Sequence, residues 1–246
     1  PAGLIQMEAG LQSFDEKTLE AVDRKTDIEK LTANLKKIIA PHNVHLHIDL
    51  IAGLPDEDYE SFRRSYGDVY AMEPEQLQLG FLKLLSGAPL NRIKEEHGYA
   101  FSENPPYELI GNRYLSSQEL LRLKEIEDVL ERYYNSGRFR TCLPILEQCF
   151  VSPFRMYEAL GAFYRAHGLV FGKISLMRQY DLLAEFGNQY GLGEDFHRAM
   201  LYDYFSTNRQ ELPPESLKYL WQKVKGTKPA ALERNCFISA MMRKIR

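Results

Sequence analysis

One segment, residues 44–55, restricts the possible folds of this chain more than any other. It reads VHLHIDLIAGLP and alternates with the period of a β-strand, in which successive side chains face opposite sides. His45, His47 and Asp49 share one face, and apolar side chains share the other. Because an unpaired buried carboxylate is strongly unfavourable, we expect Asp49 to face a polar cavity, where solvent, a ligand or another side chain pairs with it.

The first 90 residues alternate between strand-like and helix-like patterns. The repeat strand–helix–strand is typical of parallel β-sheets, whose strands are joined by crossover helices. The S-x-x-E sequence from Ser13 to Glu16 has the form of a capping box at the start of the first helix. The expected strands are residues 4–8, 44–51 and 75–83, and the expected helical segments are residues 15–39, with a break near Thr26, and residues 56–72.

Each expected strand has one apolar face and one polar face. A parallel sheet that is covered on both sides reads instead as nearly continuous apolar runs, and a closed eight-stranded barrel is filled with branched apolar side chains. The pattern therefore favours part of a barrel with a wide polar lumen, in which ligands bind at the carboxyl ends of the strands. The polar faces carry Gln6, Glu8, His45, His47, Asp49, Gln76 and Gln78.

After residue 91 the pattern becomes helical. Ser116 and Glu119 form a second capping-box sequence, and residues 104–107 read as an extended connector because of two consecutive prolines. The sequence thus predicts three βα units of a partial (βα)6 barrel in residues 1–91, followed by a helical domain in residues 92–246. The expected helices are residues 116–135, 152–168, 173–190, 194–206, 214–225 and 229–244.

Composition excludes several classes of protein. The chain has 246 residues, 44% hydrophobic and 26% charged, with a formal net charge of −3, which gives no general attraction to nucleic acid or membranes. No apolar run approaches the roughly 20 residues that span a bilayer. Three cysteines without a CxxC pair predict a reducing, cytoplasmic setting. A first residue other than Met leads us to expect a piece of a longer protein.

Several motifs, in order along the chain, resemble the later part of the radical S-adenosylmethionine (SAM) core. The pattern is similar to that of oxygen-independent coproporphyrinogen oxidase and of the cobalamin-binding Fe–S oxidoreductases. Two segments of the helical half, NPPYE from Asn104 and YYNSG from Tyr133, resemble the uncharacterised domain that follows such cores. The core motifs are EAGLQSF (residues 8–14), DRKT (residues 23–26), DLIAGLP (residues 49–55) and QLGFLK (residues 78–83).

The resemblance implies that the three strands are the fourth, fifth and sixth of the family's barrel. By position, Gln12, Arg24 and Asp49 would contact SAM, and Lys83 lies in the segment that would border the adenosine. An Arg fork suits the methionine carboxylate, and an Asp can accept from ribose hydroxyls or the amino group. The whole enzyme would hold SAM, a [4Fe–4S] cluster and, in some members, cobalamin.

The family's CxxxCxxC motif, whose three thiolates hold the cluster, is absent from this sequence. We therefore expect no cofactor and no activity in this chain alone, and a missing N-terminal part of the same protein as its partner. The edge of the strand at residues 4–8 would be covered by the chain terminus or would pair with a second copy in a dimer. The resemblance names no small-molecule substrate.

Other interpretations remain open from the residues themselves. Gln12 and Ser13 can serve in helix capping, Arg24 can pair with Asp23 or Asp27, and Asp49 can form an ion pair with Arg24 or Lys83. His45 and His47, with Asp49, offer the ligands of a metal-dependent hydrolase. The helical half, rich in Tyr and Phe, can be an interaction module, although helical spacing favours a core role for most of these rings.

Overall fold

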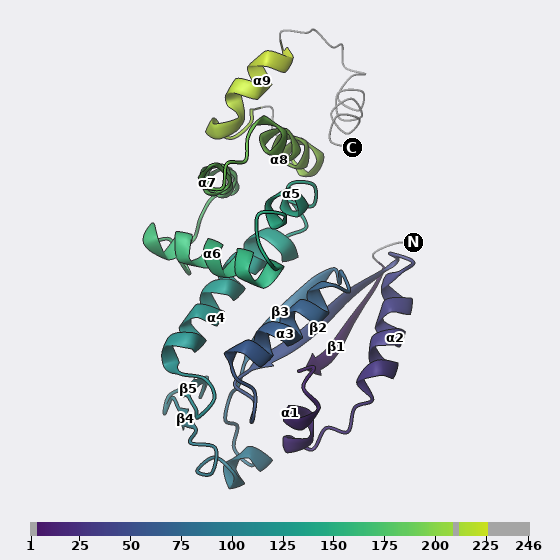
Figure 1. Ribbon diagram of the computed structural model, residues 1–246, viewed down its shortest axis with the longest axis vertical. Coiled ribbons are helices and arrows are strands. Elements are labelled where there is room, and N and C mark those ends of the chain that lie inside the picture. The colour runs from purple at the N-terminus through teal and green to yellow at the C-terminus, as the bar shows by residue number, and fades with distance from the viewer. Residues whose placement is uncertain (1–3, 209–211, 226–246) are drawn as a thin grey trace. The chain divides into compact units, whose positions relative to one another are not determined.

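The computed structural model describes residues 4–208 and 212–225 of the chain (Figure 1). It divides into two compact units, Pro1–Glu127 and Asp128–Arg246. The first unit contains a three-stranded parallel sheet, and the second is helical over its described residues. This agrees with the α/β and all-α parts predicted from the sequence.

The sheet of the first unit has the strand order β1-β2-β3, with every pair parallel. Because consecutive strands are neighbours and run in the same direction, each connection crosses over with a helical segment. The strands are β1 (Ile5–Gln12), β2 (Val44–Ala52) and β3 (Gln76–Phe81), and the crossover helices are α1 (Glu16–Ala21), α2 (Ile28–Ile39) and α3 (Tyr59–Tyr70).

The apolar face of the central strand is the core of this unit. Leu46, Ile48 and Leu50 of β2 are at most 1% exposed, and α2 and α3 both contact this strand. On the edge strand β1, Ile5 is 54% and Met7 42% exposed, and among the described residues β1 pairs with β2 alone. The expected cover over this edge is therefore not seen in the described residues and stays a prediction.

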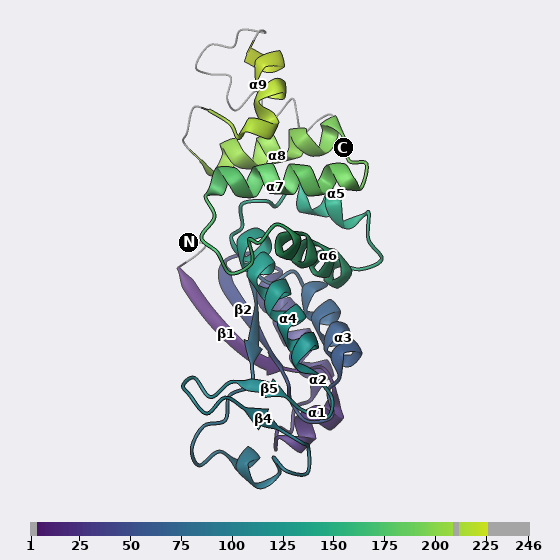
Figure 2. The same cartoon turned by 90° about the vertical axis from the view of Figure 1, so that its left-hand side faces the viewer.

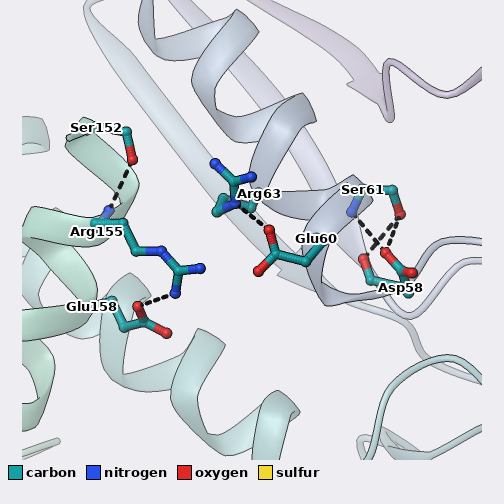
Figure 3. Close-up of polar contacts among 7 residues, drawn as sticks. All are labelled: Asp58, Glu60, Ser61, Arg63, Ser152, Arg155 and Glu158. Carbon is teal, nitrogen blue, oxygen red and sulfur yellow. Dashed lines mark hydrogen bonds and ion pairs between the residues drawn. The ribbon is translucent and has the colours of Figure 1, made fainter.

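Aspartates begin the crossover helices. Asp58 Oδ1 accepts from the Ser61 backbone N–H at 2.7 Å and caps α3, on which Glu60 and Arg63 form an ion pair (Figure 3). Asp27 caps α2 in the same way, which confirms the break expected near Thr26. The cap of α1 is Asp15.

The capping box predicted from Ser13 to Glu16 is wrong. The Ser13 hydroxyl donates to the Glu57 carboxylate at 2.6 Å instead, and Asp15 takes the cap with its Oδ1 accepting from Thr18 N–H. Both bonds of this hydroxyl hold it outside the cap position: its hydrogen goes to a carboxylate from a distant loop, and its oxygen accepts from Asp15 N–H. The second predicted box is confirmed, because Ser116 and Glu119 bond each other's backbone N–H groups at the start of α4 (Ser117–Leu130).

The first unit continues past residue 91, where the sequence placed a domain boundary. A short hairpin of β4 (Ala100–Phe101) and β5 (Leu109–Gly111) follows the 3-10 turn η1 (Pro89–Arg92) (Figure 2). Leu109 N–H donates to Leu82 O at 2.9 Å, and Leu84 N–H donates to Tyr107 O at 3.0 Å, so this segment folds back onto the end of β3. The domain boundary expected after residue 91 therefore stays a prediction.

Helices make up the described part of the second unit, after α4 crosses the boundary and ends in a π-helical turn. The predicted helices to residue 225 are confirmed, and α5 was not predicted. The helix expected at residues 229–244 lies outside the described residues. The elements are η2 (Glu131–Asn135), α5 (Leu143–Glu147), α6 (Pro153–Ala166), α7 (Leu176–Gln189), α8 (Glu194–Thr207), η3 (Glu215–Leu217) and α9 (Lys218–Lys225).

The aromatic side chains of the second unit form its core. Tyr133 and Tyr164 are fully buried and share a hydrogen bond of 2.6 Å between their hydroxyls. This confirms the core role expected for most of the rings and leaves the proposed docking surface without support. Ser152 caps α6, along which Arg155 and Glu158 pair (Figure 3). None of the helices in the described ranges is long and apolar enough to cross a membrane.

Candidate functional site

The polar side chains predicted for one sheet face do lie together. In parallel strands, register partners share a face, and Asp49 of β2 is aligned with Gly10 of β1 and Gln78 of β3. One position earlier on the same face, His47 is aligned with Glu8. The central carboxylate therefore stands in a polar row that crosses all three strands.

Asp49 is held in a partly desolvated position. Burial raises the pKa of its carboxyl above the usual range, the Glu8 carboxylate raises it further, and His47 lowers it. Its Oδ1 atom is buried and has no hydrogen-bond partner among the residues that the structure describes. No ion pair joins Asp49 to Arg24 or Lys83 among the described residues, so the structural pairing considered from the sequence is not seen. A buried carboxylate oxygen of this kind can accept from a donor on a ligand.

Arg24 and Gln12 both reach Gly10, which is the register partner of Asp49 on the neighbouring strand. The Arg24 Nη1 atom donates to Gly10 O at 2.6 Å. A Cβ atom built on Gly10 would lie 4.0 Å from both Arg24 Nη2 and Gln12 Nε2, so both side chains reach this glycine. We call this place, where Gln12, Arg24 and Asp49 surround Gly10, the Gly10 corner. It lies toward the carboxyl ends of β1 and β2, where the sequence predicted ligand binding.

Local backbone geometry directs Gln12 to this corner. The β1–β2 register shifts between Gly10 and Gln12, and Gln12 has a φ of 70°, which an L-residue adopts only where its surroundings fix it. The strand therefore ends at Gln12 with a sharp change of direction. The sequence indicated Gln12 as a candidate site residue but gave no signal for this turn.

Lys83 does not join the Gly10 corner. It lies beyond the end of β3, its side chain is exposed, and its backbone forms an isolated bridge with Glu108. No described contact links Lys83 with Gln12, Arg24 or Asp49. A contact between Lys83 and a cofactor stays a prediction. In this segment, only the backbone up to Lys83 remains a candidate for contact with a ligand.

The two histidines of β2 do not form a metal centre with other described residues. No group of three or more His, Cys, Asp or Glu side chains in the described ranges could hold a metal ion. The His47 Nε2 atom lies 3.3 Å from Gln6 Nε2, and the His45 and His47 rings meet edge to face. Hydrogen bonding and ring contact thus account for this pair.

Two features of the site had no counterpart in the sequence reasoning. Glu57 is fully buried and accepts from Ser13 and Ser65. The Gly53 carbonyl accepts from the Tyr99 hydroxyl at 2.9 Å and from Asn112 Nδ2 at 3.1 Å. Most of these partners lie more than 40 residues apart, so helix or strand periodicity carries no signal for them.

The family of the chain follows from a comparison with protein-family models. The model described as a protein of unknown function, DUF4080, matches residues 95–245, which is more than half of the chain. The chain belongs to the DUF4080 family. The match begins close to the domain boundary predicted after residue 91, and it takes in the hairpin that folds onto β3.

Two methyltransferases are among the curated relatives of this DUF4080 chain. The chain is 35% identical over 103 residues to the cobalamin-dependent radical SAM methyltransferase TokK of Streptomyces tokunonensis. It is 33% identical over 103 residues to 2-(S-pantetheinyl)-carbapenam-3-carboxylate methyltransferase of Streptantibioticus cattleyicolor. Each match covers 42% of the chain and 15% of the relative. The chain thus spans a small part of these relatives.

A third curated relative and one solved structure are also similar to part of the chain. The chain is 29% identical over 93 residues, 37% of its length and 18% of the relative, to the oxygen-independent coproporphyrinogen-III oxidase-like protein HemZ of Bacillus subtilis. The solved structure of the radical SAM enzyme coproporphyrinogen III oxidase (HemN) from Escherichia coli matches 50% of the chain and 33% of its own, with 20% identity and a TM-score of 0.31. The sequence matches confirm the similarity to radical SAM proteins.

Proposed function

We propose that this chain is part of a radical SAM enzyme and that the Gly10 corner contacts SAM. The observation that carries the proposal is the convergence of Gln12, Arg24 and Asp49, each named beforehand from the family pattern, around one glycine at the carboxyl ends of two parallel strands. Ligands of parallel sheets bind at such ends.

The residues of the corner fit the chemistry of SAM. Asp49 offers to a hydroxyl or amino donor a buried oxygen that has no partner within residues 4–208 and 212–225. The Arg24 guanidinium is exposed and gives one N–H to Gly10 O, which leaves other donors of its planar fork for a carboxylate. Gln12 can donate to or accept from a third polar group. We place no described residue of this chain on the cluster or on cobalamin.

In the proposed reaction, this chain binds SAM and sets its orientation. When bound, the cluster and SAM together supply the radical chemistry of the family. Arg24 holds the methionine carboxylate of SAM, and Asp49 accepts from the ribose hydroxyls or from the amino group, so that two charged side chains orient the bound molecule. The substrate is a small molecule that we leave unnamed. The class of reaction is determined by parts of the enzyme outside the Gly10 corner.

The partial barrel is also part of the proposal. The polar face of β1-β2-β3 would line the lumen, and a further strand of the same protein would pair with the edge of β1. The exposure of Ile5 and Met7 on this edge strand supports such a cover, because a paired neighbour with its own helix would bury them.

A binding measurement tests the proposed site. The natural full-length protein that contains this chain is titrated with SAM by calorimetry, without oxygen. Arg24→Ala and Asp49→Asn should each weaken binding about tenfold or more, since each removes a charge-assisted hydrogen bond. Arg63→Ala is the matched control, because Arg63 pairs with Glu60 on α3. Equal affinity in all four proteins would contradict the site.

A further inference from the structure

Glu57 is a buried acid that the proposed site does not use directly. It lies in the loop between β2 and α3, with a side chain that is fully buried. Its neighbour Asp58 caps α3 (Figure 3), so the start of that helix fixes the position of Glu57. A carboxyl group in such a place needs partners, because desolvation penalises its charge.

Two serine hydroxyls supply those partners, and both lead to the same loop. Ser13 donates to Glu57 Oε1 at 2.6 Å while its oxygen accepts from Asp15 N–H at 3.0 Å. Ser65 of α3 donates to the same Oε1 at 3.1 Å while its oxygen accepts from Phe14 N–H at 3.1 Å. Each hydroxyl therefore connects the carboxylate to a backbone N–H of the loop after β1.

These connections restrain the loop next to Gln12. Ser13 follows Gln12 directly, and Phe14 and Asp15 follow Ser13. A hydroxyl has one hydrogen, so donation to Glu57 leaves its lone pairs oriented toward the backbone donors. If the acceptor at position 57 were removed, both hydroxyls could rotate away, and the two backbone N–H groups would lose their partners.

The charged form of the Glu57 carboxyl is unfavourable in this position. Burial raises the pKa of its carboxyl to about 7, the Ser13 and Ser65 hydrogen bonds lower it, and the Asp15 and Asp58 carboxylates raise it. The second oxygen, Oε2, is buried and finds no hydrogen-bond partner in the described part of the chain. The chain thus keeps an unfavourable group here, and the restraint of the loop gives a reason for it.

We propose that Glu57 is a positioning residue, which acts through Ser13 and Ser65 to fix the loop after β1 and so sets Gln12 at the Gly10 corner. The part of this inference that concerns SAM rests on the proposed function. The part that concerns the loop stands on the hydrogen bonds alone. Glu57 itself touches neither Arg24 nor Asp49 in the described contacts.

Hydrogen exchange of the full chain tests the loop directly. Glu57→Ala should speed the exchange of the Phe14 and Asp15 amides about tenfold, because both lose a restrained acceptor. Glu57→Gln keeps a side-chain oxygen that can accept from both hydroxyls and should restore exchange close to that of the unaltered chain. The amides of β2 are the internal reference for global stability.

A pair of serine variants distinguishes a local change in the loop from a general loss of folding. Ser65→Ala removes the partner of Phe14 N–H and should speed exchange at Phe14. Ser61→Ala removes a buried hydroxyl from the same helix that bonds to Asp58, and it should leave Phe14 unchanged. Equal exchange at Phe14 in these two variants, or at Phe14 and Asp15 in Glu57→Ala and the unaltered chain, would overturn the proposal.

The SAM affinity of the full-length protein separates the two claims. Weaker binding in Glu57→Ala with recovery in Glu57→Gln supports the positioning of Gln12. Undiminished binding in Glu57→Ala, despite faster loop exchange, would overturn that role. No binding by the unaltered protein, together with the expected exchange pattern, would contradict the proposed function and still support the restraint of the loop by Glu57.

Discussion

The Asp49 carboxylate lies in the central strand, and one of its oxygens is buried without a hydrogen-bond partner among the described residues. Its position was predictable, because strict alternation in residues 44–50 puts it on the polar face. Its alignment with Gly10, and the reach of Arg24 and Gln12 to that glycine, were not, because register and turn geometry arise only when the strands pair.

Asp49→Asn should raise the free energy of unfolding of the ligand-free chain slightly, because it removes a charge that burial and Glu8 disfavour, although solvent screens part of this effect. The same change should weaken SAM binding. Groups kept for a ligand commonly reduce stability in this way. Urea unfolding of both chains measures the effect, and a clear loss of stability in the variant would show that Asp49 has a structural partner.

Glu57 gives the chain a pH-dependent stability of predictable sign. Its pKa is raised from 4.5 to about 7 in the folded chain, so the folded state binds this proton more tightly than the unfolded state. Stability from this group is therefore full below the unfolded pKa and is lost as pH rises through 4.5 toward 7. The groups that face it are the Asp15 and Asp58 carboxylates and the two serine hydroxyls.

Glu57→Gln cannot titrate and should gain stability relative to the unaltered chain between pH 4.5 and 8, by up to about 3 kcal/mol. Urea unfolding at several pH values measures the difference. Glu29→Gln, at an exposed position in the first turn of α2, controls for the change of charge. Parallel stability curves for the Glu57→Gln and unaltered chains would contradict the raised pKa.

At the scale of elements, the sequence predicted the helices and strands that are determined by the pattern of neighbouring residues. Period-two alternation located the strands, and the structure confirms the helix break expected near Thr26 and the helix start expected at Ser116. The β4–β5 hairpin was not predicted, because strands of two and three residues carry too few positions for a period. Ser13 was assigned to a helix cap for a similar reason: the Glu57 carboxylate that claims it lies 44 residues away.

The loop after β2 depends on the hairpin region. Gly53 has a φ of 99°, and a Cβ atom there would lie 2.1 Å from Leu109 Cδ2. Gly53→Ala should lower the free energy of unfolding by about 3 kcal/mol or more, because backbone strain and overpacking add. Gly87→Ala is the control, since Gly87 has a φ of 79° but nothing within 4 Å, and should cost only about 1 kcal/mol. Equal losses would show that Leu109 moves aside freely.

At the scale of the whole molecule, the sequence predicted a parallel α/β part and a helical part, and both are present. The compact units nevertheless divide after Glu127, because backbone hydrogen bonds join residues 107–109 to the end of β3. The sequence did not reveal this, since residues 104–107 read as a connector and not as a partner for the end of the third strand.

The edge of β1 carries a prediction at this scale. In the full-length protein, the amides of Ile5 to Gly10 that point away from β2 should exchange slowly, because a further strand would accept their hydrogen bonds. In the 246-residue chain the same amides should exchange quickly, unless two copies pair through this edge. Sedimentation separates these cases. Fast exchange in both proteins would contradict the partial barrel.

The central claim is that the Gly10 corner serves radical SAM chemistry, and one measurement tests it most directly. The full-length protein, purified without oxygen and supplied with a reductant, is assayed for cleavage of SAM to 5′-deoxyadenosine, with its iron and sulfide content measured in parallel. We predict a cluster and cleavage in the unaltered protein, with cleavage strongly reduced in Arg24→Ala and Asp49→Ala while the iron content is unchanged. A protein that holds no cluster and leaves SAM intact, or one in which both variants cleave SAM at the unaltered rate, would contradict the account.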